Sequence, residues 1–558
     1  MNKKNNIRLG IVTLLLLAWI SSFAQLNNIK NESYFLISDR SIYGAGETIY
    51  FSAMPRRIYL TPEDKTISQV YYCDIVSQNG EVIASEKFKA NREGISGSIT
   101  IPDNILSGNY LLRGYTRWMR NFPHENFQYI PLILIHPESP GFTDVFKENE
   151  LMQETVVTDG FSISISNPYV LKREKVNIEI AANDQKIIPD NRNICIAVLK
   201  KGFQNYGSHA LKKGIIKEKT TQKQWFLPEI YGPTLSAQVS NGSSVNFELS
   251  RINLSMSNGY HELVIARINN RGKVFFQLPN QTGKNDMYLL PEHRDIELQI
   301  DRDFAKSRNF NPYMRAISDD DSIFGKKVSQ FVFYKQLAQL YSLEQKNDVA
   351  IEANALSEKP FYGKAIYQYK MDDFILLGSF AEYLRDLMPQ VKLTDLNGDS
   401  RLVLLTEKGS ILGYTPLLLI DHVPTSLDNL LKLDPRILKK VDIVNKRYIK
   451  GSETFDGILS VFTKSGDFGS VEFPANGHFF EYKLLSRVRD YKRNLPGKDF
   501  LPDLNPVLAW HSGMKMDDEY SCRTQIVAND IPGIYVIVVS AISNEGVVLQ
   551  SSAEFTVK

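Results

Sequence analysis

The segment from Pro416 to Gly466 constrains the fold of this chain more than any other stretch. It begins with a run of large apolar residues, Leu417 to Ile420, and continues through a turn and a helical pattern into two more strand-like runs, 440–445 and 457–464. Apolar runs of this kind are typical of strands buried on both faces, and two such strands need a crossover connection to lie parallel. We therefore expect the first two strands to form a small βαβ unit, an α/β island in a chain that otherwise reads as β.

Fixed positions recur in order along this segment. The matching residues are Pro416, Leu417, Ile420, Asp421, Val423, Pro424, Asp434, Pro435, Ile437, Val441, Ile443, Gly457, Ile458, Val461, Thr463, Lys464 and Gly466. This pattern resembles the plug domain of TonB-dependent outer-membrane receptors. Two features depart from that family: His422 stands where a glycine is usual, although histidine adopts a positive φ less easily, and the loop from Tyr448 to Gly457 replaces a glycine-rich loop.

A plug domain normally lies inside a barrel formed by its own chain. A barrel of roughly 22 strands needs several hundred residues, whereas residues 467–558 are all that follow here. The resemblance therefore implies that the plug-like unit acts outside a self-encoded barrel and docks a separate outer-membrane protein, a barrel or its machinery.

The composition limits the classes of partner. The 558 residues include 65 Lys and Arg against 63 Asp and Glu, a net charge of +2 with both signs interspersed. No large basic field is available for nucleic acid, and the 23% of charged residues favours folded domains over disorder. The length predicts about three to five domains.

The N-terminus has the pattern of a signal peptide. Lys3, Lys4 and Arg8 precede an apolar run from Leu9 to Ile20, and small residues follow up to Ala24. The run is shorter than a membrane span. We expect residues 1–24 to be removed and the mature protein to be exported, in the periplasm or associated with the outer membrane, without a transmembrane segment of its own.

The first part of the mature chain carries a second family motif. Asp39, Arg40, Tyr43, Gly46 and Glu47 match a pattern that resembles the macroglobulin (MG2) domain of the α2-macroglobulin family, with Ala45 in place of the usual proline. The resemblance implies a β-sandwich over residues 25–139. The Asn79-Gly80 pair predicts a tight hairpin turn within it.

Two aromatic residues near the end of this domain are candidates for partner binding. The phrase LLRGYTRWMRNF, residues 111–122, resembles one repeated in exported gram-negative proteins that carry this domain. Trp118 and Phe122 either form an exposed aromatic lip or pack on the end of the sandwich, since large aromatic side chains in small sandwiches are mostly buried.

The remaining chain divides by composition. Tyr169, Arg173, Glu174 and Val176 repeat the plan of the first domain and indicate a second sandwich. Together the patterns predict a mainly β chain of tandem immunoglobulin- or macroglobulin-like sandwiches with one small α/β plug-like domain. The predicted domains are 140–225, a second sandwich; 226–302, a third that resembles carboxypeptidase-regulatory-like sandwiches; 303–358, a helical connector; 359–468, the plug-like domain; and 469–558, a C-terminal immunoglobulin-like domain.

The sequence does not point to an enzyme. The eight histidines form no metal-binding pattern, and no nucleophile, phosphate-binding or dinucleotide motif is present. Cys73, Cys195 and Cys522 are odd in number and do not predict a disulfide framework; Cys73 and Cys195 lie in apolar runs and are expected to be buried. We therefore predict no cofactor and no metal.

Three functions remain open from the sequence. The first is a non-catalytic scaffold whose plug-like domain docks an outer-membrane partner. The second is a surface adhesin or glycan-binding protein that uses the loops of the sandwiches, and the third is a hydrolase on a β scaffold. The candidate partner-binding residues are Asp421, His422, Pro424, Tyr448, Trp118 and Phe122.

Overall fold

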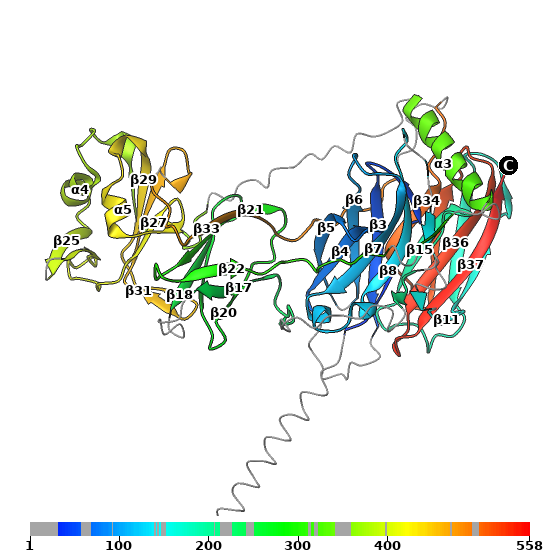
Figure 1. Cartoon of the computed structure of the whole chain (residues 1–558), viewed down its shortest axis with the longest axis horizontal. Coiled ribbons are helices and arrows are strands. Elements are labelled where there is room, and N and C mark those ends of the chain that lie inside the picture. Colours follow the sequence, from blue (N-terminus) through cyan, green and yellow to red (C-terminus); the bar gives the residue numbers. More distant parts are fainter. Residues whose placement is uncertain are drawn as a thin grey trace, which may run out of the picture. The chain divides into compact units, whose positions relative to one another are not determined.

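A computed structural model gives the fold of this chain, which is mainly β as predicted (Figure 1). The chain divides into two compact units. Unit 1 comprises residues 1–230, 306–344 and 488–558, and unit 2 comprises residues 231–305 and 345–487. The predicted signal peptide, 1–24, lies outside the described residues. The structure describes residues 32–56, 68–91, 93–138, 141, 144–146, 152–153, 155–205, 207–211, 226–241, 250–310, 314–316, 322–340, 359–396, 399–468, 471–493 and 501–558.

Unit 1 begins with a sandwich of eight strands. Its sheets have the strand orders β1-β3-β6 and β2-β8-β7-β4-β5. The predicted Asn79-Gly80 turn joins β4 to β5, and Gly80 takes the positive φ (85°) that the turn requires. The strands are β1 (Tyr34–Ser38), β2 (Ile42–Gly44), β3 (Thr48–Pro55), β4 (Val70–Ser77), β5 (Val82–Lys89), β6 (Ile95–Thr100), β7 (Gly108–Thr116) and β8 (Gln128–Ile135), and two 3-10 turns, η1 (Trp118–Asn121) and η2 (His124–Asn126), precede β8.

The second sandwich of unit 1 is built from two distant segments of the chain. Its sheets have the orders β12-β14-β35 and β11-β37-β36-β15-β34, with β13 also paired to β37. The prediction of separate domains at 140–225 and 469–558 is therefore wrong, because neither segment supplies enough strands to enclose a core. The strands are β11 (Val157–Thr158), β12 (Phe161–Ile165), β13 (Tyr169–Val170), β14 (Lys175–Ala182), β15 (Asn193–Lys200), β34 (Val507–Lys515), β35 (Ser521–Val527), β36 (Gly533–Ile542) and β37 (Val548–Val557).

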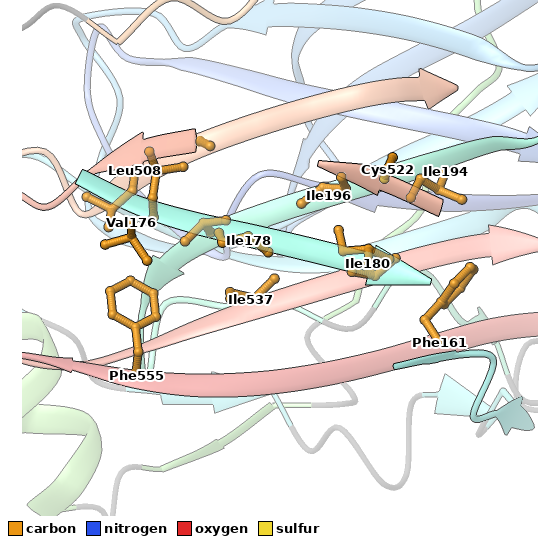
Figure 2. Packing of buried hydrophobic residues seen from close by; sticks show 14 of the residues in the cluster. Phe161, Val176, Ile178, Ile180, Ile194, Ile196, Leu508, Cys522, Ile537 and Phe555 are labelled. Atoms are coloured by element: carbon orange, nitrogen blue, oxygen red, sulfur yellow. The ribbon is translucent and has the colours of Figure 1, made fainter. Parts of the chain in front are cut away.

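The core of this sandwich joins the two segments. Val176, Ile178 and Ile180 of β14 point toward Ile537 of β36 and Phe555 of β37 (Figure 2). All five side chains are buried. The alternation that the sequence shows in β14 is the alternation between this core and solvent.

The two sandwiches of unit 1 are copies of one fold. Strands β1 to β8 correspond in sheet order to β12, β13, β14, β15, β34, β35, β36 and β37. Their turns correspond as well: the Glu47 carboxylate accepts a hydrogen bond from the Gly44 amide (2.7 Å), and the Glu174 carboxylate accepts one from the Leu171 amide (2.6 Å). The weak internal repeat in the sequence therefore reflects a duplicated fold.

The repeat is shifted by one residue from the sequence prediction. Val170, not Tyr169, takes the place of Tyr43, because Tyr43 pairs with Leu134 and Val170 pairs with the corresponding Val557. Tyr43 and Val170 are both buried, whereas Tyr169 is 58% exposed.

The two copies pack against each other through one sheet of each. Ile37 and Met54 of the first copy share an apolar cluster with Cys195, Trp510 and Val538 of the second. Strands β15 and β36 are consequently buried on both faces, as their burial patterns show. Helix α3 (Ser322–Leu340), within the predicted connector, adds two buried and one partly buried side chain to this cluster. Short ribbons pair β9 (Asp144–Phe146) with β23 (Met314–Ala316) and β10 (Met152–Gln153) with β16 (Ala210–Leu211).

Unit 2 contains a third sandwich with sheets β20-β17-β22 and β19-β18-β21-β33. Strand β33 falls within the segment predicted as the C-terminal domain, so that boundary also differs from the structure. The strand is recruited because Tyr482 and Leu484 complete this core. The strands are β17 (Thr234–Asn241), β18 (Arg251–Met256), β19 (Glu262–Arg267), β20 (Lys273–Gln277), β21 (Lys284–Pro291), β22 (Glu297–Ile300) and β33 (His478–Lys483).

An α/β lobe forms the rest of unit 2, and its main sheet has the order β24-β29-β32-β27-β28. Helices α4 and α5 contribute to one apolar cluster of this lobe. The elements are β24 (Tyr367–Lys370), η6 (Met371–Asp373), α4 (Phe380–Glu382), the π-helical turn η7 (Tyr383–Leu387), β25 (Val391–Leu396), β26 (Asp399–Leu404), β27 (Leu417–Ile420), β28 (Val423–Pro424), α5 (Leu427–Leu431), η8 (Pro435–Ile437), β29 (Leu438–Val444), β30 (Tyr448–Lys450), β31 (Glu453–Phe455) and β32 (Ile458–Thr463).

The three predicted strands of the lobe are present, but their predicted pairing is wrong. Strand β32 lies between β27 and β29; it is parallel to β27 and antiparallel to β29. The crossover connection therefore joins β27 to β32 and contains both α5 and β29. The rule that parallel strands need a crossover holds, but for a different pair of strands.

The chain order is nested. Along the chain, the strands of the third sandwich are inserted between β15 and β34 of the second sandwich. In the first copy the β4–β5 turn occupies the corresponding position. The elements of the lobe are in turn inserted along the chain between β22 and β33 of the third sandwich. Hairpin turns tolerate such insertions because the flanking strands stay paired.

Candidate functional site

The turn between β27 and β28 holds the residues that the sequence singled out most strongly. Asp421 (φ 44°) and His422 (φ 71°) both adopt the left-handed conformation, and Ile420 pairs with Val423 across them. A two-residue hairpin turn with two positive φ angles favours Asp-Gly. This preference accounts for the glycine that is usual in the receptor-plug pattern where this chain has His422.

Asp421 organises the end of the neighbouring strand. Its carboxylate accepts hydrogen bonds from the Thr463 amide (2.8 Å), the Thr463 hydroxyl (2.6 Å) and the Phe468 amide (3.1 Å). Burial raises the pKa of Asp421, and these three donors oppose that rise. Asp421 is 5% exposed, and in this structure its carboxylate holds the turn against β32.

His422 packs against a second histidine. The ring centroids of His422 and His261 lie 3.8 Å apart, with 14° between the ring planes, and the Phe462 ring meets His422 edge to face with its centroid 5.1 Å away. His422 is 6% exposed. Burial, together with the nearby His261 and Lys440, lowers the pKa of His422 to about 3. His422 is therefore a neutral, buried side chain at the contact between the lobe and the third sandwich.

The other two predicted residues of the lobe are partly buried. Pro424 pairs in register with Leu419. Tyr448 packs on an apolar cluster with Leu263 of the third sandwich, and its ring lies 6.3 Å from that of Phe361. Tyr448 therefore also takes part in holding the lobe on the sandwich.

Trp118 and Phe122 lie in unit 1, separate from the four residues of the lobe. Their rings meet edge to face at 5.8 Å, and both are partly buried. Between them, the Asn121 side chain forms hydrogen bonds of 2.8 Å with both the amide and the carbonyl of Phe226. This arrangement agrees with packing on the end of the sandwich, the second of the two interpretations.

The lobe has an exposed feature that the sequence analysis missed. Ile375 and Leu376, which we call the apolar tip, are 79% and 63% exposed. The buried Tyr383 hydroxyl donates to the Ile375 carbonyl (2.9 Å) and accepts from the Leu377 amide (3.2 Å). The backbone of the tip is thus fixed from inside while its two large side chains face solvent.

The apolar tip follows an edge strand. Among the described strands β24 pairs only with β29, so one side of its backbone is unpaired. Its side chains alternate between partly buried Tyr367 and Tyr369 and exposed Gln368 and Lys370. Free strand edges can pair with a strand of another protein. The edge and the tip together are the candidate binding site, within residues 367–376.

No group of three or more His, Cys, Asp or Glu side chains among the described residues is placed to hold a metal ion, and no described helix is long and apolar enough to cross a membrane. Cys73 and Cys195 are buried as predicted, and burial raises the pKa of both thiols; Cys522 is also buried, with its pKa raised to about 11.

Neither a protein-family model nor a curated protein matches this chain. Solved structures that match include a mutant alpha-2-macroglobulin from Salmonella, with 8% identity over 95% of this chain and 39% of that protein and a TM-score of 0.24. The native conformation of Escherichia coli alpha-2-macroglobulin also matches, with 8% identity over 95% of this chain and 40% of that protein and a TM-score of 0.24. The chain spans about two fifths of the length of these proteins.

Proposed function

We propose that this chain is a non-catalytic, exported scaffold whose α/β lobe docks a separate outer-membrane protein, a barrel or its transport or assembly machinery. The observation that carries the proposal is the apolar tip beside the edge of β24 that no described strand covers. The resemblance of residues 416–466 to receptor plugs supports an outer-membrane partner.

The apolar tip has the properties of a binding anchor. Isolated exposed apolar residues are common on protein surfaces, but Ile375 and Leu376 are adjacent, and the Tyr383 hydroxyl fixes the backbone that carries them. A fixed backbone lowers the entropy cost of binding because the side chains are already presented. A few side chains that become fully buried near the centre of an interface contribute most of its binding energy.

The edge of β24 would orient a bound partner relative to the apolar tip. A partner strand added to β24 would continue the five-stranded sheet, and its main-chain hydrogen bonds would set the register. Exposed Lys370 ends β24, and exposed Asp372 and Asp373 lie between it and the tip. The proposed site therefore combines main-chain pairing, two apolar anchors and a polar strip.

Site-specific photocrosslinking tests the proposal. A photoreactive amino acid at Leu376 should capture an outer-membrane β-barrel protein from the host envelope after mild detergent extraction, with the captured protein identified by mass spectrometry. The same group at Leu106, a 77% exposed leucine of the first sandwich, is the matched control and should not capture it.

A double variant measures the contribution of the tip. Ile375→Ser with Leu376→Ser should weaken binding of the identified partner about tenfold or more, while thermal unfolding stays unchanged because both side chains are exposed. Equal capture at positions 376 and 106, or unweakened binding by the double variant, would contradict the proposal. Glycan binding that maps to the sandwich loops would favour the adhesin alternative.

A further inference from the structure

The stacked histidines join two parts of unit 2. His261 lies just before β19 of the third sandwich, and His422 lies in the β27–β28 turn of the lobe. Strand β28 packs beside β18, and Leu263 of β19 shares an apolar cluster with Leu417 and Leu419 of β27. The histidine pair therefore sits at the contact by which the lobe is attached.

The conformation of His422 indicates that its side chain is needed there. With a φ of 71°, position 422 would accept glycine with less strain. The imidazole occupies this strained position and gains a stacking contact with His261 and an edge contact with Phe462.

Burial makes a positive charge on either ring unfavourable; at His261 a hydrogen bond with the Met256 backbone opposes the resulting fall in pKa but does not overcome it. Among the described atoms, the Nδ1 atoms of His261 and His422 are buried and have no hydrogen-bond partner. On β29, Lys440 points its amine at the Phe462 ring (4.1 Å) and at Asp442 (3.1 Å). Protonation of either imidazole would add a buried cation on this side of the pair.

The carboxylates on the same elements are already engaged. Asp421, beside His422, accepts from Thr463 and Phe468. Glu262, beside His261, pairs with Lys450. No carboxylate of these turns is left to stabilise an imidazolium, so a proton is bound better when the two rings are apart.

We propose that the His261–His422 stack is an acid-sensitive latch that holds the α/β lobe on the third sandwich. The latch does not depend on the identity of any partner. The sign follows from linkage: burial and neighbouring charge lower the pKa of His422 to about 3, whereas a detached imidazole has a pKa of about 6.5. The stabilisation that a neutral imidazole gives to the attached state is present above pH ~6.5 and is lost as the pH falls toward 3.

Thiol labelling of the full chain measures the opening of this contact. Leu263→Cys places a thiol at a fully buried position between sandwich and lobe, and 4,4′-dithiodipyridine reacts with thiols at acidic pH. The labelling rate, divided by that of a free peptide at the same pH, gives the opening constant. From His422 alone we expect it to rise about 16-fold between pH 6.5 and pH 5.0.

A non-titrating stack is the control. In a chain with His261→Phe and His422→Phe the aromatic contact remains but no proton is bound, so the opening constant should stay constant over this range. Circular dichroism and the opening constant at pH 7.5 check that the control is folded. An equal rise in both chains, or no rise with the native histidines, would overturn the proposal. So would a normal titration of His422 near pH 6.5 in the attached state, measured by NMR with labelled histidine.

Discussion

The two sandwiches of unit 1 share one fold but differ in what covers their three-stranded sheets. In the first copy, five consecutive residues of β3, Phe51 to Pro55, are buried because the sheet packs on the second copy. In the second copy, β14 alternates buried and exposed residues because its outer face meets solvent. The elements that pack on a sheet, rather than its fold, therefore set the apolar pattern of its strands.

The turns of the two copies differ as well. In the first copy a short turn containing Gly80 joins β4 to β5. In the second copy the corresponding connection contains the third sandwich and the lobe. The same hairpin therefore closes the fold in one copy and carries the proposed binding part of the molecule in the other.

The largest expected difference between the copies concerns their corresponding residues in β2 and β13. Ile42 is 2% exposed, whereas the corresponding Tyr169 is 58% exposed. Ile42→Ser should lower the free energy of unfolding of unit 1 by about 3 kcal/mol, because it removes a buried side chain and buries a hydroxyl. Tyr169→Ser should change it by less than about 0.5 kcal/mol. Urea unfolding of the full chain measures both, and similar losses would contradict the assigned correspondence.

A smaller difference is expected at the two turn carboxylates. Burial alone would raise the pKa of Glu47, but Arg40 (2.8 Å) and Lys335 of α3 (2.6 Å) lower it to about 2. Among the described residues no cation pairs with Glu174. Glu47→Gln should therefore cost about 2 kcal/mol at pH 7, and Glu174→Gln much less.

The pH dependence of stability gives the sign of this effect. A carboxylate with a lowered pKa stabilises the fold above its unfolded value, near pH 4.5, and this stabilisation is lost as the pH falls toward 2. Glu47→Gln should flatten the stability curve in that range, which urea midpoints at several pH values would show. An unchanged slope would mean that Glu47 is not held by Arg40 and Lys335.

The smallest expected difference concerns a tyrosine found at corresponding positions of β7 and β36. The Tyr110 hydroxyl lies 2.8 Å from the Leu106 carbonyl, and the Tyr535 hydroxyl lies 2.8 Å from the Ile531 carbonyl. Tyr535 also contacts the Asn529 side chain (2.5 Å). Removing either hydroxyl should cost about 1 kcal/mol, and more for Tyr535→Phe because it leaves two buried partners. Thermal unfolding compares the two, and a larger loss for Tyr110→Phe would contradict this ranking.

Local features of the chain could be predicted from the sequence. The mainly β class and the Asn79-Gly80 turn follow from alternation and turn chemistry, and the strands of residues 416–466 follow from their apolar runs. The pairing of these strands could not be predicted, because β32 enters between β27 and β29 from later in the chain. The joining of 140–225 with 469–558 was missed for the same reason: periodicity identifies a strand but not its neighbour.

The candidate site was harder to predict. Asp421 and His422 were conspicuous because a motif singled them out, yet both are buried. Ile375 and Leu376 belong to the apolar run Phe374 to Leu377, which reads as core in the sequence. Their backbone is fixed by the Tyr383 hydroxyl, a contact that apolar periodicity does not reveal, and the stack of His422 on His261 depends on a contact between elements far apart in the chain.

The central structural claim is that the second sandwich is one domain closed across the inserted residues, and a cross-strand disulfide tests it directly. Cys195 of β15 lies opposite Ser540 of β36, a spacing that a disulfide can bridge. With Ser540→Cys we predict a 195–540 disulfide in the exported protein, detected by mass spectrometry of tryptic peptides. Val539→Cys, one residue away on the opposite face, should form none with Cys195. Absence of the 195–540 bond, or an equal yield from Val539→Cys, would contradict the pairing of β15 with β36 in one domain.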